Sequence, residues 1–159
     1  GTFMIGDTFT EGEKLKFTGI PSFAPEHFRY IENADPMKFK QLAKGIDQLM
    51  DEGVAQLFTS SLNGRKIIGT VGALQFEVIQ YRLEHEYGAK CRWEPISIYK
   101  ACWIESDNAA QLADFKKRKF TNMAVDKHGR DVFLADTSYA LQLAIEKFPD
   151  IRFKFTSEF

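Results

Sequence analysis

The sequence predicts an α+β protein whose helices cover an antiparallel β-sheet in the split βαβ arrangement. Between residues 23 and 95, segments with the period of a strand or a helix follow one another in the order β-α-β-β-α-β. The same order recurs between residues 98 and 155, without a repeat of the sequence itself. The composition is that of an ordinary globular chain, with 44% apolar and 27% charged residues. We therefore expect a ferredoxin-like lobe followed by a second α/β lobe of similar element order.

Residues 1–20 carry two short strand patterns, Thr2–Ile5 and Lys14–Thr18, around a turn-rich stretch. Two strands without a third are marginally stable. We therefore expect this segment to be the edge of a neighbouring β-domain. The chain also opens without an initiator methionine, so we expect it to be a piece of a longer polypeptide.

The first lobe is predicted to open with a strand near His27–Ile31, followed by a helix. Asp35 offers a side chain to cap the helix, and Pro36 suits its first position. Gly53 is expected to end it. The residues predicted to share its buried face are Phe39, Leu42, Ala43, Ile46, Leu49 and Met50.

Two strands, Val54–Thr59 and Arg65–Val71, are predicted to form a hairpin around the turn Asn63-Gly64. A helix then follows directly, with Gly88 as its left-handed C-cap, and Ala89–Trp93 supplies the last strand of the lobe. We attribute the glycines at the strand-to-helix turn, Gly69 and Gly72, to close packing of the backbone. The predicted buried face of this helix consists of Phe76, Ile79, Leu83 and Tyr87.

The second lobe is predicted to begin with strand Ile98–Ile104 and a helix capped by Ser106 or Asp107, with Leu112 and Phe115 facing inward. The remaining predicted elements are strands Met123–Asp126 and Asp131–Ala135 around the turn KHGR, a helix capped by Thr137 that buries Leu141, Ala144, Ile145 and Phe148, and strand Ile151–Phe155.

Charge and hydropathy exclude several classes of protein. The net charge of −1 shows no global attraction to nucleic acid or to acidic membranes. No apolar run approaches the ~20 residues of a membrane span, so we expect a soluble protein. Cys91 and Cys102 have no metal-ligand spacing, which favours buried free thiols in the cytoplasm over a disulfide.

The residues that usually carry catalysis are scattered. His85 lies on the polar face of a predicted helix and His128 in a turn, while His27 stands apart from both. The glycine cluster GTVG lacks the lysine and hydroxyl of a phosphate-binding loop, and Ser60-Ser61 has no paired histidine. We therefore expect no catalytic residue, no cofactor-binding residue and no metal ligand in this chain.

One cluster of charge stands out: Lys116, Lys117, Arg118 and Lys119. Cations at the end of a helix offset its macrodipole, but four in a row exceed what that requires. Contact with RNA phosphate is an equally good interpretation. The predicted hairpin carries two further candidates for this contact, Arg65 and Lys66, and Lys90 and Arg92 lie on a predicted strand.

Three stretches resemble one family: FMIGDTFTEGEKLKFTGIPSFAPEHFRYI, QLAKGIDQLMDEGVAQLF and IIGTVGALQFEVIQYRLEHEYGAKC. They are similar to the bacterial class II peptide-chain release factor, the translational GTPase called release factor three. The related elongation factor G has a similar GxGELHLE stretch, and Gln75 stands where that stretch carries histidine. This difference favours the release-factor branch.

The resemblance implies a GTP-binding domain, a β-barrel and a C-terminal α/β region, in that order. Residues 1–20 are then the tail of the barrel, residues 21–95 a lobe like domain III of elongation factor G, and residues 96–159 the C-terminal α/β lobe. The GTP-binding domain, with its catalytic residues, GTP and Mg, lies outside this chain. The chain itself is accordingly not expected to be an enzyme or to hold a cofactor.

The resemblance further implies that the full-length GTPase promotes dissociation of class I release factors from the ribosome. We expect this chain to be a rigid monomeric arm that touches ribosomal RNA and ribosomal proteins. The alternative is a ferredoxin-like module that regulates through a small ligand or binds RNA, since the helix-free face of such a sheet can hold a ligand or stack bases.

Overall fold

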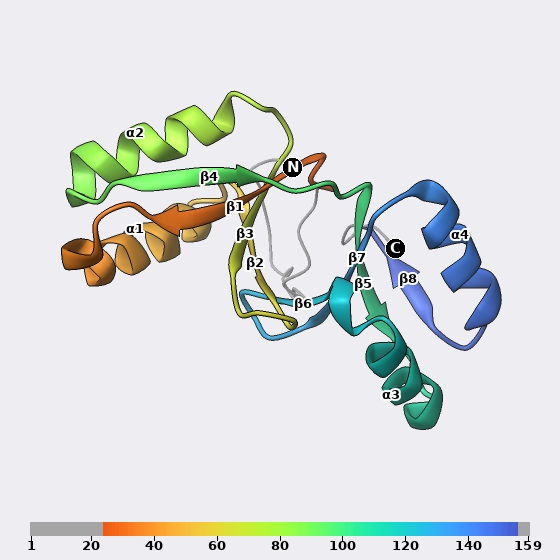
Figure 1. Cartoon of the computed structure of the whole chain (residues 1–159). Coiled ribbons are helices and arrows are strands. Elements are labelled where there is room, and N and C mark those ends of the chain that lie inside the picture. The colour runs from red at the N-terminus through yellow and green to blue at the C-terminus, as the bar shows by residue number, and fades with distance from the viewer. Residues whose placement is uncertain (1–23, 156–159) are drawn as a thin grey trace, which may run out of the picture.

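The computed structural model describes residues 24–155, and its first lobe has the predicted order β-α-β-β-α-β (Figure 1). The strands predicted at Thr2–Ile5 and Lys14–Thr18 lie outside the described residues. The division into domains after residues 20 and 95 stays a prediction. The elements of the first lobe are β1 (His27–Asn33), the 3₁₀ helix η1 (Pro36–Lys38), α1 (Phe39–Asp51), β2 (Gln56–Ser60), β3 (Lys66–Thr70), α2 (Gln75–Tyr87) and β4 (Cys91–Pro95).

The second lobe repeats this order, with a 3₁₀ helix after its first α-helix. Its strands β6 and β7 have the bounds that the sequence predicts. The elements are β5 (Lys100–Glu105), α3 (Ala109–Arg118), η2 (Phe120–Asn122), β6 (Met123–Asp126), β7 (Asp131–Ala135), α4 (Ser138–Lys147) and β8 (Arg152–Lys154).

The strands of both lobes form one eight-stranded sheet in the order β4-β1-β3-β2-β6-β7-β5-β8. All neighbouring strands in it are antiparallel. The first four strands have the order of a split βαβ lobe, and the last four have the same order reversed. The lobes join where β2 pairs with β6, which places Phe58 opposite Asp126 and Ser60 opposite Ala124. The predicted α+β fold class is confirmed.

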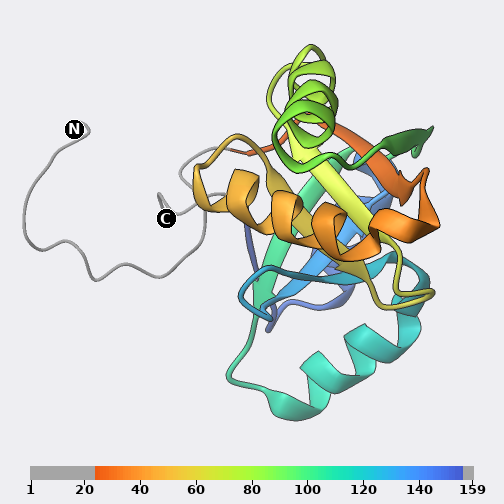
Figure 2. The same ribbon diagram turned by 90° about the vertical axis from the view of Figure 1, so that its left-hand side faces the viewer.

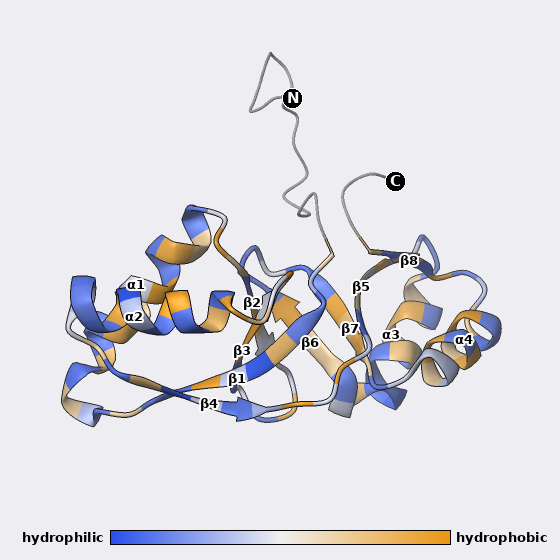
Figure 3. Ribbon diagram, turned by 90° about the horizontal axis from the view of Figure 1, so that it is seen from above, coloured by the Kyte–Doolittle hydropathy of each residue, from blue (hydrophilic) through white to orange (hydrophobic). Residues whose placement is uncertain are grey.

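The two helix pairs lie at opposite ends of the molecule, with the strands between them (Figure 3). Successive residues of a strand point to opposite faces of the sheet, and the sheet uses both faces. Ile68 of β3 belongs to the core under α1 and α2, whereas its neighbour Ile67 belongs to a core shared by both lobes. The helix-free faces are therefore buried against each other.

The shared core is centred on aromatic side chains. Phe58 of the first lobe is fully buried, with its ring centroid 6.2 Å from that of Phe28 and 5.9 Å from that of Trp103 in the second lobe. The buried members of this core are Phe28, Phe58, Ile67, Ala101, Trp103, Ala124, Val132 and Leu134. Burial of a large apolar side chain contributes about 1.5–3 kcal/mol, so the lobes hold together by packing as well as by strand pairing.

The start of α1 differs from the prediction in its phase. Asp35 caps the segment as predicted and accepts a hydrogen bond from the Met37 amide at 3.0 Å. A 3₁₀ turn precedes the α-helix, which begins at Phe39, and the buried face of that helix is turned towards Gly45, which lies against α2. Phe39 and Ala43, predicted to be buried, are exposed, and Gly45 is buried instead. The predicted positions Leu42, Ile46, Leu49 and Met50 are confirmed as buried.

Helices α1 and α2 approach each other closely at Gly45. A Cβ atom there would lie 2.6 Å from Cδ2 of Leu83 and 2.9 Å from Cδ2 of Tyr87. The predicted face of α2 is confirmed: Phe76, Ile79 and Leu83 are fully buried, and Tyr87 packs against the same core.

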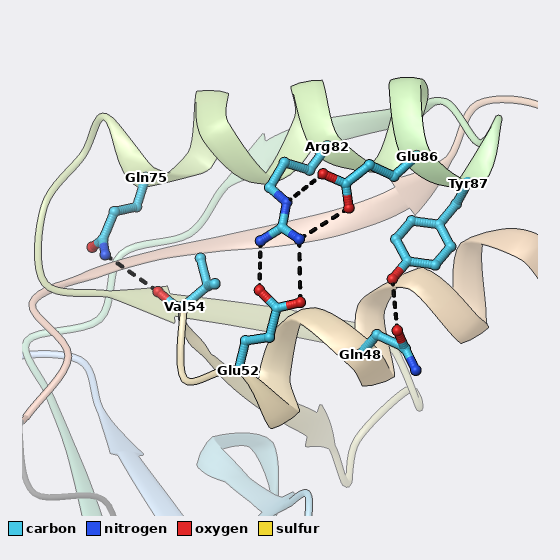
Figure 4. A network of polar contacts seen from close by, with 7 residues as sticks. All are labelled: Gln48, Glu52, Val54, Gln75, Arg82, Glu86 and Tyr87. Carbon is cyan, nitrogen blue, oxygen red and sulfur yellow. Dashed lines mark hydrogen bonds and ion pairs between the residues drawn. The ribbon is translucent and has the colours of Figure 1, made fainter. Parts of the chain in front are cut away.

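Polar contacts also join the two helices (Figure 4). Arg82 pairs at 2.6 Å with Glu52, the C-cap of α1, and at 2.8 Å with Glu86 of its own helix. The Tyr87 hydroxyl donates to Gln48 of α1 at 3.0 Å. The pKa of Glu52 is below its ordinary value, mainly because Arg82 donates hydrogen bonds to the carboxylate.

Two predictions about the helices of the second lobe are wrong. The cap of α3 is Asn108, which accepts from the Gln111 amide at 3.0 Å, rather than Ser106 or Asp107. In α4, Ile145 is exposed. Thr137 caps α4 as predicted, and Leu141, Ala144 and Phe148 are buried on its inner side.

Both cysteines are free and buried, as predicted. Burial raises the pKa of the Cys91 thiol to about 11 and that of Cys102 to about 12. Both thiols are therefore protonated at neutral pH and have the character of small apolar core residues. Among the described residues, no helix is both long and apolar enough to cross a membrane.

Candidate nucleic-acid interface

The predicted basic cluster lies at the C-terminal end of α3. Lys116, Lys117 and Arg118 form the last turn of the helix, and Lys119 is its C-cap. Cations at this end interact favourably with the unpaired carbonyl groups of the helix. The helix therefore accounts for part of the cluster, as expected from the sequence.

Two of the four cations have a carboxylate partner. Lys116 lies 3.0 Å from Asp131 of β7, and Arg118 lies 2.9 Å from Asp114, one turn earlier in α3. Within residues 24–155, the side chains of Lys117 and Lys119 make no ion pair. These two are the cations of the cluster that remain available to an external phosphate.

Arg65 is not available in the same way. Its Nη2 atom lies 2.6 Å from Glu32 of β1 and 2.7 Å from Glu94 of β4, and its guanidinium lies 3.7 Å from the centre of the Tyr30 ring. The pKa of Glu94 is lowered, mainly by the hydrogen bond that Arg65 donates. The negative charge of the two carboxylates therefore exceeds the positive charge of Arg65. The ammonium group of Lys66 donates a hydrogen bond to the Thr59 hydroxyl at 3.0 Å. Contact of Arg65 and Lys66 with the ribosome remains only a prediction from the sequence.

The β2–β3 hairpin and the end of α3 lie next to each other, as the views of Figures 1 and 2 both show. The Ser61 amide donates to the Met123 carbonyl at 2.9 Å, which ties the hairpin to the start of β6. Leu62 of the hairpin and Phe120 after α3 are exposed by 51% and 48%. We call the side chains of Lys117, Lys119, Phe120 and Leu62 the basic tip.

Lys90 and Arg92, considered as extensions of a basic patch, lie far from the basic tip in the sheet. Arg92 belongs to the edge strand β4, and Lys90 directly precedes that strand. In the strand order, β1, β3 and β2 separate β4 from β6. The sheet therefore does not bring these two cations together with Lys117 and Lys119.

Among the residues that the structure describes, no group of three or more histidine, cysteine, aspartate or glutamate side chains is placed to hold a metal ion. A cleft of about 580 Å³ opens between the lobes, beside the start of β1 and the N-terminus of α4, and it contains His27, Ser97 and Ser138. His27 makes no hydrogen bond to either serine in the described part of the chain. Within the described residues, neither serine is hydrogen-bonded to a base that could activate it as a nucleophile.

The glycines of the GTVG turn have different roles. A Cβ atom at Gly69 would lie 3.0 Å from Pro25 and 3.1 Å from Phe58, so the predicted close packing is confirmed there. At Gly72 the nearest heavy atom would be 3.9 Å away, at Gln75, and close packing is the wrong explanation.

Gln75 fixes the strand-to-helix turn (Figure 4). Its Oε1 accepts from the Gly72 amide at 2.9 Å, and its Nε2 donates to the Val54 carbonyl at 3.2 Å. A primary amide has both an acceptor and donors, so one side chain satisfies both backbone groups. Gln75 thus has a structural role in this fold.

Comparison with known proteins gives the family. The family model described as "Class II release factor RF3, C-terminal domain" matches residues 17–145, well over half of the chain. A solved structure from Thermus thermophilus is similar at 16% identity with a TM-score of 0.43. That similarity covers 64% of this chain and 17% of the other, so it identifies neither function nor partner. On the family match, this chain belongs to the family of class II release factor RF3 C-terminal domains.

Proposed function

We propose that this domain is the ribosome-facing arm of a GTPase that promotes dissociation of class I release factors from the ribosome. Membership of the family makes the chain part of a translation termination factor, whose function involves the ribosome. GTP and Mg²⁺ would be bound by another domain of the full-length protein. The arm would contribute contact and rigidity, and it would act as a monomer.

The observation that carries this proposal is the junction between the lobes. Pairing of β2 with β6 makes the two sheets continuous, and the shared core fills the space between their helix-free faces. Packed interiors deform little and transmit displacement. A body of this kind is suited to passing a movement of the GTPase on to the ribosome, or to resisting one.

The basic tip is the surface that we propose for contact with ribosomal RNA. Lys117 and Lys119 make no ion pair within residues 24–155, and the neighbouring exposed Phe120 ring can stack on an unpaired base. Each phosphate that such a cation neutralises releases counterions, which makes the affinity depend on salt.

The structure weighs against the alternative of an RNA-binding sheet face. That mode of binding needs exposed aromatic side chains on the helix-free face. Phe28, Phe58 and Trp103 lie on that face and are buried in the shared core. A base would have to separate the two lobes to reach them.

Ribosome binding by the full-length protein tests the proposal. The variant Lys117→Glu/Lys119→Glu should bind purified ribosomes about tenfold or more weakly, and the slope of log K against log salt should fall by about 1 for each phosphate that the protein no longer touches. The matched control is Lys44→Glu/Lys147→Glu, which reverses two exposed lysines on α1 and α4. If the Lys117/Lys119 variant binds ribosomes as tightly as the wild-type protein does, the basic tip is not the interface with RNA. Absence of ribosome-stimulated GTP hydrolysis in the wild-type protein would remove the proposed activity.

A further inference from the structure

Helix α2 has two apolar faces. Its inner face fills the core of the first lobe, as an amphipathic helix should. Its outer face is also apolar: Leu74, just before the helix, is 73% exposed, Val78 49% and Tyr81 61%. With His85, these residues follow the spacing 4, 3, 4, which places them on one line along a helix. We call Leu74, Val78, Tyr81 and His85 the α2 stripe.

The stripe lies directly opposite the buried face. At 100° per residue, Val78, Tyr81 and His85 point about 180° away from the mean direction of the buried side chains. Single exposed apolar residues are ordinary, but a line of them over three turns of one helix marks an interaction surface. The described residues leave this line uncovered.

The aromatic part of the stripe is already ordered. The rings of Tyr81 and His85 stack with centroids 3.9 Å apart and an angle of 22° between their planes. Nδ1 of His85 lies 2.9 Å from the Tyr81 carbonyl oxygen, which holds the imidazole along the helix. A surface whose side chains are held in place loses little conformational entropy when a partner binds.

The rim of the stripe is acidic. Glu77 and Glu84 are exposed along one side of it. On the other side, Arg82 is shared between Glu52 and Glu86, so this cluster carries one more negative than positive charge (Figure 4). RNA phosphate would be repelled by such a rim, whereas lysine and arginine would be attracted.

We propose that the α2 stripe docks a ribosomal protein segment whose apolar side chains are bordered by lysine or arginine. Charge complementarity selects this partner over RNA. Helices α2 and α3 lie at opposite ends of the molecule in both Figure 1 and Figure 2, so the domain would touch RNA and protein through separate surfaces. This inference rests on the proposed function, since it assumes that the full-length protein binds ribosomes.

Site-specific photocross-linking tests the docking. Benzoylphenylalanine replaces Tyr81 in the full-length protein, and in a matched control it replaces Tyr139 of α4, which is 72% exposed. Each protein is irradiated on purified ribosomes with a non-hydrolysable GTP analogue, and cross-linked products are identified by mass spectrometry. We expect position 81 to cross-link to a ribosomal protein segment that carries lysine or arginine next to apolar residues, and position 139 not to do so.

Three results would overturn the inference: cross-links from position 81 to RNA, to another domain of the same chain, or to nothing while the protein still co-sediments with ribosomes. Failure of the wild-type protein to co-sediment would contradict the proposed function as well. A second measurement uses Glu77→Lys/Glu84→Lys, which should weaken ribosome binding at least fivefold with an unchanged melting temperature. Unchanged binding by this variant would contradict the acidic rim as part of the docking surface.

Discussion

The two lobes have the same order of elements and are stabilised in different ways. In the first lobe, the helices approach closely at Gly45 and are joined by the ion pair between Arg82 and Glu52. In the second lobe, the Phe115 ring occupies the centre and makes edge-to-face contacts with three other rings. Its centroid lies 5.2 Å from that of Phe133, 4.9 Å from that of Phe148 and 5.7 Å from that of Phe153. One topology thus accommodates a helix-to-helix core in one lobe and a core around a single aromatic ring in the other.

This difference makes the lobes sensitive to different substitutions. A core that depends on one ring is vulnerable to its loss, and a close helix crossing is vulnerable to added volume. Because the lobes share a sheet, a substitution that destabilises either core should also lower the stability of the other lobe.

The largest effect is expected for Phe115→Ala. The ring is fully buried, and truncation of such a residue costs about 3–5 kcal/mol. In a Trp103→Phe background, denaturant unfolding followed by the fluorescence of Trp93, in the first lobe, should shift to a lower midpoint although Trp93 is remote from the substitution. Phe120→Ala, at an exposed position, is the control and should leave the midpoint nearly unchanged. An unshifted Trp93 transition in Phe115→Ala would mean that the lobes unfold separately.

A smaller effect is expected for Gly45→Ala. Overpacking against Leu83 and Tyr87 costs about 1–3 kcal/mol, offset by up to about 1 kcal/mol because alanine is the better helix former. Gly72→Ala is the control, because its Cβ atom would meet nothing closer than 3.9 Å. The melting temperatures of the two variants are compared. If Gly45→Ala melts at the same temperature as Gly72→Ala, the two helices can move apart with little loss of stability.

A pH-dependent effect is expected for Asp126, opposite Phe58 at the junction of the lobes. Burial raises the pKa of its carboxyl, but hydrogen bonds from the Arg130 and His128 amides and from the Trp103 indole, with the Arg130 charge, outweigh burial and lower it below the ordinary 3.8. The stabilisation is therefore present above the pKa of the unfolded chain and is lost as the pH falls through the lower folded value.

Asp126→Asn should accordingly lower the free energy of unfolding by about 1.5–3 kcal/mol at pH 7, since it removes hydrogen bonds to a charged group. The difference from wild type should narrow as the pH falls below about 4. Urea unfolding of both proteins at several pH values measures it. A difference that stays constant down to pH 2 would show that ionisation of Asp126 does not stabilise the junction.

The sequence predicts the parts of this fold that depend on local pattern. Strands such as Met123–Asp126 and caps such as Thr137 are predicted correctly because their signals lie within a few residues. The predicted burial of Phe39 is wrong because the buried face of α1 is turned towards Gly45, which lies against Leu83 and Tyr87 of α2. The local sequence pattern does not show on which side a neighbouring helix packs. The pairing of β2 with β6 could not be predicted, since the register between distant strands leaves no local signal.

The candidate interface is predictable to the same extent. The run from Lys116 to Lys119 is visible in the sequence, but its division into paired and unpaired cations depends on Asp131, a residue of another strand. Arg65 is a candidate in the sequence because its partners Glu32 and Glu94 become its neighbours only when β1, β3 and β4 align.

The most direct test of the central claim, that the two lobes form one body, uses the two tryptophans of the chain. Trp93 packs on Phe76 in the first lobe, and Trp103 lies in the shared core. In Trp103→Phe and in Trp93→Phe, urea unfolding would be followed by fluorescence of the remaining tryptophan and by circular dichroism. We predict that the fluorescence and circular dichroism transitions coincide in each variant, as for one cooperative unit. Separate transitions for the two tryptophans would show that the lobes fold independently and would contradict the proposal of a rigid arm.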